Sequence, residues 1–303
     1  MVCSFANHNI LYLILYIYSK KAVIFLTLLW TKFFTVVKGF VGRRKVNFMV
    51  NMIESKDNPK VKQALKIAND ASFRRKNKLF FASTSKVVFD ILSAGFEHEI
   101  LFILEAEYEK FENRLPQKNV YVISESVSDK LSEGKTEDGV YAVFRMKENS
   151  EDEILKANKL LVLEDVQDPA NMGAIMRTAL AFGYENVVVT NKCADVFSRK
   201  VIRTSMTASV KVNVYKTNDL VSFTEKLNGN GFTTVAACLE GAIELGSEKI
   251  GLPVALYIGN EGNGLSDEII KTCKMRVKIP MSDKIESLNA GVSAAVLMWE
   301  LRG

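Results

Sequence analysis

The chain has 303 residues, which is enough for one large domain or two domains of ordinary size. Hydrophobic residues make up 48% of it and charged residues 25%, so the composition excludes a chain that is mainly disordered. With only 5 prolines and 17 glycines, it also excludes collagen-like and linker-dominated proteins.

The net charge of +5 comes from one end of the chain. Residues 1–48 contain seven basic residues and no acidic ones, which leaves 33 basic and 35 acidic side chains in residues 49–303. The overall basic balance is therefore no argument for a nucleic-acid partner. Such an argument must rest on local patches of charge.

Residues 1–48 also differ from the rest in hydropathy. Two apolar runs, at 10–18 and 22–30, are each shorter than the roughly 20 residues that span a bilayer. A signal peptide fits this pattern poorly. A membrane hairpin or interfacial anchor and an ordered extension of the fold both stay open. The abrupt change in composition favours a third interpretation, in which the segment lies upstream of a true start at Met49 or Met52. Membrane association is expected only if the apolar runs are retained.

The cysteine and histidine pattern argues against metal and disulfide sites. The chain contains four cysteines and only two histidines, and none of the cysteines belongs to a CxxC pair. We therefore expect no metal, no disulfide framework, and reduced thiols in a cytoplasmic protein.

Residues 53–147 are expected to form a small α/β domain. A helix is predicted at 58–69, where apolar side chains recur on one helical stripe. The other elements predicted here are a strand at 79–81, a helix at 87–94, and strands at 99–104 and 139–145. The acidic stretch from 147 to 159 is interpreted as a linker or a linking helix.

Residues 158–303 alternate between strand and helix patterns. The predicted strands are 160–163, 186–190, 212–215, 233–238, 254–258 and 276–279. The predicted helices are 172–182, 220–227, 267–273 and 288–301. Such alternation indicates an α/β fold with a mainly parallel sheet and helices on both faces. Ligands of such sheets bind beyond the carboxyl ends of the strands.

The first candidate loop, DVQDPANMGAIMRTA, follows the strand at 160–163. Asn171 is placed to cap the following helix, and Gly173 with Ala174 keeps the first turn slim. Arg177 lies on a face of small residues, so we expect it to point at a group outside its helix. A capped helix with a surface arginine is the plainer alternative.

The second candidate loop, IGNEGNGL, follows the strand at 254–258 and holds three glycines, which allow close backbone approach. It matches neither GxGxxG nor the P-loop, so it is not read as a dinucleotide or triphosphate site. Glu261 within it is placed to meet a substrate or an arginine. A tight strand-to-helix turn is the alternative.

The third candidate region reads IPMS and then ESLNAGVSAA. Ser287 can cap the final helix, in which Val292, Val296 and Trp299 have core spacing. The small residues of this helix suit close packing, either within the chain or across a dimer.

In this order, the three loops resemble the SpoU (TrmH-like) family of RNA 2′-O-ribose methyltransferases, in the SPOUT superfamily. The family motifs N-x-G-A-x-x-R-T-A, (I/L)-G-x-E-G-x-G-(L/I) and I-P-M…S-L-N are all present, and the resemblance covers residues 53–303. Two departures stand out: Thr207 replaces a usual glycine, and residues 82–84 lack a usual Glu-Gly pair.

The resemblance implies a deeply knotted C-terminal domain, a homodimer, and S-adenosylmethionine as the cofactor. The cofactor contacts that it implies are Gly259, Asn260, Gly262, Ile279, Met281, Ser287 and Leu288. An apolar slot with backbone hydrogen bonds at these loops suits an adenine ring.

The catalytic residues that the resemblance implies are Asn171, Arg177, Glu261 and Asn289. Because an arginine is effectively always protonated, we expect Arg177 to anchor the target phosphate and stabilise the developing alkoxide. Asn171 is expected to position Arg177 or the ribose, Glu261 to orient Arg177, and Asn289 to hold the loop.

RNA binding has a local basis in two groups of cations. The expected RNA-binding residues are Lys56, Lys60, Arg74 and Arg75 in one basic strip, and Lys200 and Arg203 nearer the site. By resemblance, rRNA is favoured over tRNA. A non-catalytic RNA-binding protein on the same fold is the alternative, and a nucleotide-dependent oxidoreductase is disfavoured because no strand–GxGxxG–helix unit occurs.

Overall fold

The computed structural model describes residues 51–134 and 137–302, which form one compact unit with two β-sheets. The expectations about residues 1–48 lie outside these ranges. Within them, no helix combines the length and the apolar character that crossing a membrane requires.

The first sheet has the strand order β1-β4-β3-β5-β2. Its strands are β1 (Asn51–Ile53), β2 (Leu79–Ser83), β3 (His98–Leu104), β4 (Val120–Ile123) and β5 (Val140–Arg145). The helical elements around it are α2 (Pro59–Asn69), α3 (Ala71–Asn77), α4 (Ser85–Ser93), η1 (Glu105–Glu107), α5 (Tyr108–Phe111), η2 (Glu112–Arg114) and α6 (Glu125–Leu131). The sheet is mixed, because β1, β4 and β3 run parallel whereas β5 is antiparallel to both β3 and β2.

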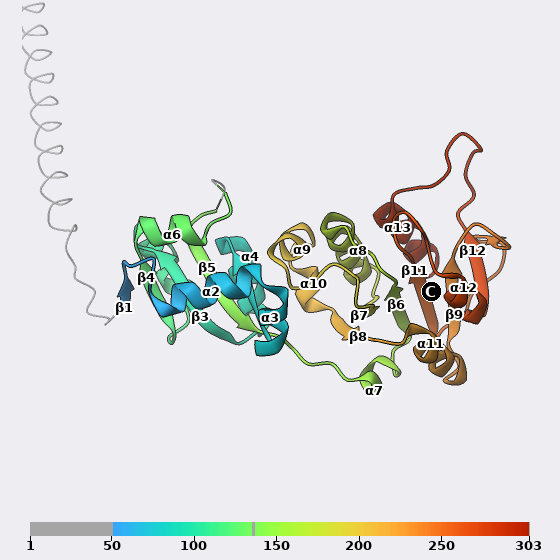
Figure 1. Cartoon of the computed structure of the whole chain (residues 1–303), viewed down its shortest axis with the longest axis horizontal. Coiled ribbons are helices and arrows are strands. Elements are labelled where there is room, and N and C mark those ends of the chain that lie inside the picture. Colours follow the sequence, from blue (N-terminus) through green and yellow to red (C-terminus); the bar gives the residue numbers. More distant parts are fainter. Residues whose placement is uncertain (1–50, 135–136, 303) are drawn as a thin grey trace, which may run out of the picture. The chain divides into compact units, whose positions relative to one another are not determined.

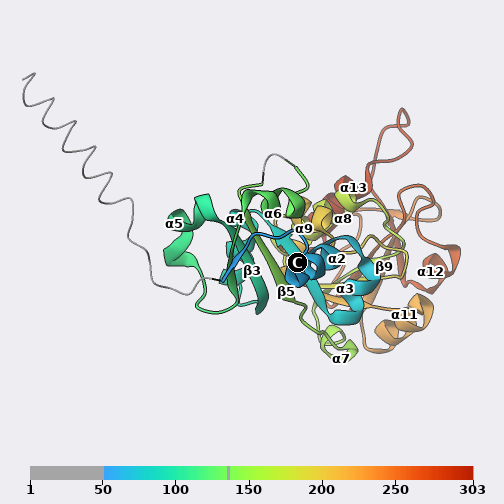
Figure 2. The ribbon, with the colours of Figure 1, turned by 60° about the vertical axis from the view of Figure 1, so that its left-hand side comes forward.

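Helices lie on both sides of this sheet (Figures 1 and 2), and its side chains alternate between two hydrophobic cores. On β3, Leu101 and Ile103 pack on the side of α4 and α5, whereas Ile100 and Phe102 pack on the side of α2 and α6. Successive side chains of a strand point to opposite faces of a sheet, and here helices cover both faces. The predicted helix at 58–69 and the strands at 79–81, 99–104 and 139–145 are confirmed; β1, β4, α3 and α6 were not predicted.

The second sheet has seven strands in the order β10-β12-β9-β11-β6-β7-β8, all parallel. They are β6 (Lys159–Leu163), β7 (Asn186–Val189), β8 (Asn213–Lys216), β9 (Thr233–Ala237), β10 (Ile243–Glu244), β11 (Val254–Ile258) and β12 (Met275–Lys278). The helices are α7 (Glu151–Ile154), α8 (Pro169–Ala181), α9 (Arg199–Thr204), α10 (Ala208–Lys211), α11 (Leu220–Gly229), α12 (Asp267–Thr272) and α13 (Ala290–Glu300). The predicted parallel sheet is thus confirmed.

Helices cover both faces of the second sheet, with α8 and α13 on one side of the strands and α11 on the other (Figure 1). Along β11, Leu256 and Ile258 face α8 and α13, whereas Ala255 and Tyr257 face α11 and α12. The segment predicted as a linker holds the single turn α7, which Ser150 and Glu153 begin with a capping box.

The final helix buries a different stripe from the one predicted. Val292, Val296 and Trp299, expected in the core, are 49%, 37% and 52% exposed. The buried residues are Gly291, Ala294, Leu297 and Met298. Because α13 is apolar on more than one side, helical periodicity gives two candidate stripes and cannot tell which one meets the sheet.

Candidate active site

The candidate site lies where neighbouring parallel strands end. Leu163 at the end of β6 pairs with Ile258 at the end of β11, so the first two loops leave the sheet side by side. The backbone amide of Glu164 continues this pairing by donating to Ile258 O at 2.9 Å. The Glu164 carboxylate then accepts from the amide and hydroxyl of Ser266, at 2.8 and 2.7 Å.

The glycine loop closes on itself through Asn260. The backbones of Asn260 and Gly264 exchange two hydrogen bonds of 2.9 Å, and Asn260 Oδ1 accepts from the amides of Gly262 and Asn263 at 2.9 and 3.1 Å. A Cβ at Gly259 would lie 2.1 Å from the carbonyl carbon of Gly264, and Gly264 itself has a φ of +69°. Glycine is therefore required at 259 by close approach and favoured at 264 by conformation.

Glu261 binds the first loop rather than an arginine. Its carboxylate accepts from Asn171 Nδ2 at 3.0 Å and from the amides of Asp168 and Gln167 at 3.0 and 3.2 Å. Burial acts to raise its pKa, but these hydrogen bonds lower it more, so the pKa of Glu261 lies below its ordinary value. The carboxylate is thus held ionised at neutral pH.

Asn289 extends this network to the third loop. Its Nδ2 donates to Asn171 Oδ1 at 2.9 Å, while its Oδ1 caps α13 by accepting from the amides of Gly291 and Val292 at 2.9 and 3.3 Å. Glu261, Asn171 and Asn289 therefore form one chain of hydrogen bonds that joins all three loops.

Two predictions about helix caps were wrong. Asp168, not Asn171, caps α8, because its carboxylate accepts from the amides of Ala170 and Asn171 while Pro169 takes the first helical position. Asn289, not Ser287, caps α13. In each case the side chain nearer the true start of the helix does the capping.

Small residues let three helices approach closely. A Cβ at Gly173 would lie 2.0 Å from Thr204 Oγ1, so the first turn of α8 lies directly against the Thr204 side chain of α9. A Cβ at Gly291 would lie 3.3 Å from the Cβ of Ala174, which brings α13 against α8. The predicted slim first turn of α8 is confirmed, and it serves helix packing.

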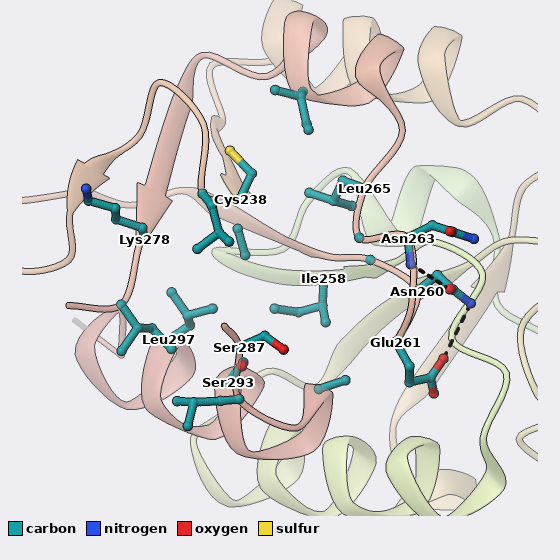
Figure 3. Close-up of a pocket in the computed structure, with 18 of the residues that line it drawn as sticks. Cys238, Ile258, Asn260, Glu261, Asn263, Leu265, Lys278, Ser287, Ser293 and Leu297 are labelled. Carbon is teal, nitrogen blue, oxygen red and sulfur yellow. Dashed lines mark hydrogen bonds between the residues drawn. The ribbon is translucent and has the colours of Figure 1, made fainter. Parts of the chain in front are cut away.

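A cavity of about 470 Å³ lies beside the glycine loop (Figure 3). All seven expected cofactor residues line it: Gly259, Asn260, Gly262, Ile279, Met281, Ser287 and Leu288. Glu261 lies at its edge, and Ile258, Leu265 and Leu297 supply apolar walls.

The sequence reasoning missed other residues of this wall. Cys238 and Glu240 follow β9, and Lys278 ends β12, and all three line the cavity. The rule that ligands bind beyond the carboxyl ends of parallel strands could have found them, because both strands were predicted.

Arg177 is exposed on α8, and its side chain makes no hydrogen bond or ion pair with any residue in the ranges that the structure describes. The expectation that Glu261 orients it directly was wrong, since the Glu261 carboxylate is occupied by the first loop. Asn171 was expected to position Arg177 or the ribose. Its side chain binds Glu261 and Asn289 rather than Arg177, and its contact with the ribose stays a prediction.

The expected RNA-binding cations have different fates. Lys56, Lys60, Arg75, Lys200 and Arg203 reach the surface, although Lys60 Nζ lies 5.0 Å from the centre of the Tyr121 ring and Arg203 lies 3.8 Å from Glu133. Arg74 is buried and paired with Asp195, so its expected contact with RNA was wrong. No cluster of three or more potential metal ligands occurs among the described residues.

Two family models match the chain. The SpoU rRNA Methylase family matches residues 158–299, and the MRM3-like substrate binding domain matches residues 58–142. The chain is 29% identical over 259 residues to the 23S rRNA (guanosine(2553)-2′-O)-methyltransferase RlmP of Bacillus subtilis, covering 84% of this chain and all of that protein.

Solved structures share the fold. The AdoMet-bound rRNA methyltransferase from Sinorhizobium meliloti has a TM-score of 0.72 at 23% identity, over 84% of this chain and 97% of that one. A TrmH-family protein from Porphyromonas gingivalis has a TM-score of 0.69 at 28% identity, over 79% and 95% of the two chains. The chain therefore carries a SpoU rRNA methylase domain at residues 158–299, preceded by an MRM3-like substrate-binding domain at residues 58–142.

Proposed function

We propose that this protein transfers a methyl group from S-adenosylmethionine to a ribose 2′-hydroxyl of rRNA. The observation that carries the proposal is the chain of hydrogen bonds from Glu261, which lines the cavity, through Asn171 to Asn289, because it joins the three loops. The relative RlmP, which aligns over its whole length, bears a name that states this activity.

The cavity residues fit the cofactor. Its walls are apolar at Ile258, Ile279 and Leu297, and the polar residues Asn260 and Ser287 also line it. An adenine ring needs this combination of an apolar slot and directed hydrogen bonds. S-adenosylmethionine supplies an electrophilic methyl group on a sulfonium, and that positive charge is compatible with the ionised Glu261 at the edge of the cavity.

The reaction forms a bond between the ribose 2′-oxygen and the methyl carbon and breaks the carbon–sulfur bond. The hydroxyl proton leaves to a phosphate oxygen or to water. Arg177 stays protonated throughout, so it anchors the adjacent phosphate and stabilises the negative charge that develops on the 2′-oxygen. Its exposed guanidinium, without a partner among the described residues, is available for this contact.

We propose 23S rRNA as the substrate, because the name of the relative RlmP states that RNA. Other relatives, including one at 31% identity from Staphylococcus saprophyticus, are named for tRNA or rRNA. The surface residues Lys56, Lys60 and Arg75 would contact phosphates of the RNA, and Lys200 and Arg203 would do so nearer the reacting ribose.

We further propose that the protein acts as a homodimer in the cytoplasm, with the knotted backbone of its family. The exposed stripe of Val292, Val296 and Trp299 on α13 supports the dimer, because an apolar patch of this kind marks an interface. The Trp299 ring packs on the Phe182 ring, with centroids 5.5 Å apart, which extends the patch, and the Arg302 guanidinium lies over the Trp299 ring.

The test is methyl transfer in vitro. Purified protein is incubated with radiolabelled S-adenosylmethionine and with unmodified transcripts of 23S rRNA or tRNA. We expect label in 23S rRNA. Label in tRNA alone would reassign the substrate, and cofactor binding without label in either RNA would contradict the proposed rRNA activity. RNA binding without cofactor binding would support the non-catalytic alternative.

A further inference from the structure

Arg74 of α3 is buried, and all three of its guanidinium nitrogens donate hydrogen bonds within the protein. Nη1 donates to the carbonyl oxygens of Ile67 and Ala68, both at 2.7 Å, and so closes the last turn of α2. Nε and Nη2 donate to Asp195 Oδ2 at 3.0 and 2.7 Å. The arginine side chain is 5% exposed and that of Asp195 is 17% exposed. This pair therefore connects the substrate-binding domain to the methylase domain.

Asp195 leads directly to the loop that follows β6. Its neighbour Ala194 donates its amide to Val166 O at 2.8 Å, and Val166 is fully buried. The amides of the next two residues, Gln167 and Asp168, are the ones that donate to the Glu261 carboxylate. A short run of hydrogen bonds thus links α3 to Glu261 at the edge of the cavity.

The junction around this pair is packed. Ile202 of α9 and Val210 of α10 lie in the same hydrophobic core as Phe80 of the first sheet, and the Phe80 and Phe197 rings are 5.5 Å apart. Lys211 of α10 donates to Asp90 Oδ2 of α4 at 2.7 Å. Because close-packed interiors transmit strain, a shift of α3 is expected to displace the segment around Asp195.

We infer that Arg74 and Asp195 are positioning residues for methyl transfer. By fixing the segment at Ala194, they hold the backbone at Gln167 and Asp168 where Glu261 needs it, so that RNA docked on the substrate-binding domain meets an ordered catalytic loop. The inference rests on the proposed function.

The test variant must not leave one charge buried without its partner, because that alone threatens the fold. The double substitution Arg74→Met with Asp195→Asn removes both charges. In the wild type, the amide of Phe197 donates a hydrogen bond to Asp195 Oδ1 at 3.0 Å. The side-chain oxygen of asparagine can accept the same hydrogen bond. Arg74→Lys retains the charge without the planar fork and serves as the conservative variant.

The first measurement is steady-state kinetics with the proposed RNA. For the double variant we expect kcat to fall at least tenfold, with KM for RNA and the Kd of S-adenosylmethionine within twofold of wild type, and partial recovery in Arg74→Lys. Arg75→Met is the matched control, because Arg75 is the exposed neighbour of Arg74. We expect Arg75→Met to raise KM for RNA through loss of a phosphate contact. A double variant with wild-type kcat and only a lower melting temperature would show that the pair stabilises the fold without positioning the catalytic loop, and would contradict the inference.

The second measurement does not depend on activity. Amide hydrogen exchange is followed at Gln167 and Asp168, with the amides of Gly262 and Asn263, which Asn260 holds, as internal controls. We expect exchange at Gln167 and Asp168 to rise at least fivefold in the double variant and the controls to stay unchanged. Unchanged exchange at all four amides would overturn the coupling. If the wild-type protein transfers no methyl group, the proposed function fails while this exchange result still decides the coupling.

Discussion

The predicted functional residues come together at the second sheet but not in the domain of the first sheet. In the parallel second sheet, every strand points the same way, so loops far apart in the chain meet at one edge, and Asn171, Glu261 and Asn289 join in one network. In the first domain, the predicted RNA-binding cations were chosen because basic residues lie close together in sequence. Neighbouring residues of a helix point in different directions, so they cannot all lie on one face. There Arg74 turns inward and Arg75 outward. Topology, rather than local pattern, decides which predicted residues converge.

The largest expected effect concerns Arg177. Replacing it with lysine keeps the charge but removes the fork that can bind phosphate and alkoxide together. We expect kcat to fall by about 10²-fold, the range found when one stabilising donor of a developing oxyanion is lost. Calorimetry should give an unchanged Kd for S-adenosylmethionine. Near-full turnover by Arg177→Lys would contradict the role assigned to this residue.

The glycine loop offers a matched pair of substitutions. Gly259→Ala places a Cβ 2.1 Å from the backbone of Gly264, whereas the nearest atom to a Cβ at Gly262 is 3.6 Å away. We expect Gly259→Ala to lower the free energy of unfolding by about 1–3 kcal/mol. Gly262→Ala should leave it nearly unchanged. Thermal melting measures both, and equal melting temperatures for the two variants would contradict the close approach of Gly259 to the backbone of Gly264.

The exposed stripe of α13 gives a prediction about assembly. Trp299→Glu puts a charge in the centre of the apolar patch and is expected to convert a dimer into a monomer in analytical ultracentrifugation. The control is Met52→Glu, which adds the same charge at an apolar residue that is 44% exposed on β1. A wild-type protein that sediments as a monomer would remove the proposed dimer.

The smallest effect is the pH dependence linked to Glu261. Because its pKa is lowered in the folded protein, the carboxylate stabilises the fold fully above its ordinary pKa. That stabilisation is lost as the pH falls through the lowered value. We therefore expect the difference in melting temperature between wild type and Glu261→Gln to be greatest near pH 7 and to shrink at acidic pH. A difference that grows on acidification would contradict the sign of the shift.

Much of the fold followed from periodicity, and the site followed from motifs. Strong hydrophobic runs such as the one at 254–258 are buried on both faces, so their pattern alone identifies them. The short strand β4, at Val120–Ile123, carries too few residues for a clear signal, and it was missed. The resemblance identified seven of the residues that line the cavity, whereas Cys238, Glu240 and Lys278 were missed although they follow or end strands that were predicted.

The sequence could not supply the partners of polar side chains. Nothing local distinguishes Arg74 from Arg75, and only the packed junction shows that one meets Asp195, more than a hundred residues later in the chain. Likewise, Glu261 was expected to meet a substrate or an arginine, but its carboxylate binds backbone amides of the first loop. Long-range hydrogen bonds of this kind depend on the assembled fold.

Alkaline hydrolysis of the RNA product tests the central claim most directly. A methylated 2′-oxygen cannot attack the neighbouring phosphate, so that linkage survives alkali. After reaction of the purified protein with 23S rRNA and labelled S-adenosylmethionine, the account predicts that the label is recovered in an alkali-resistant dinucleotide. Label recovered only in single nucleotides would place the methyl group on a base and would contradict ribose methylation.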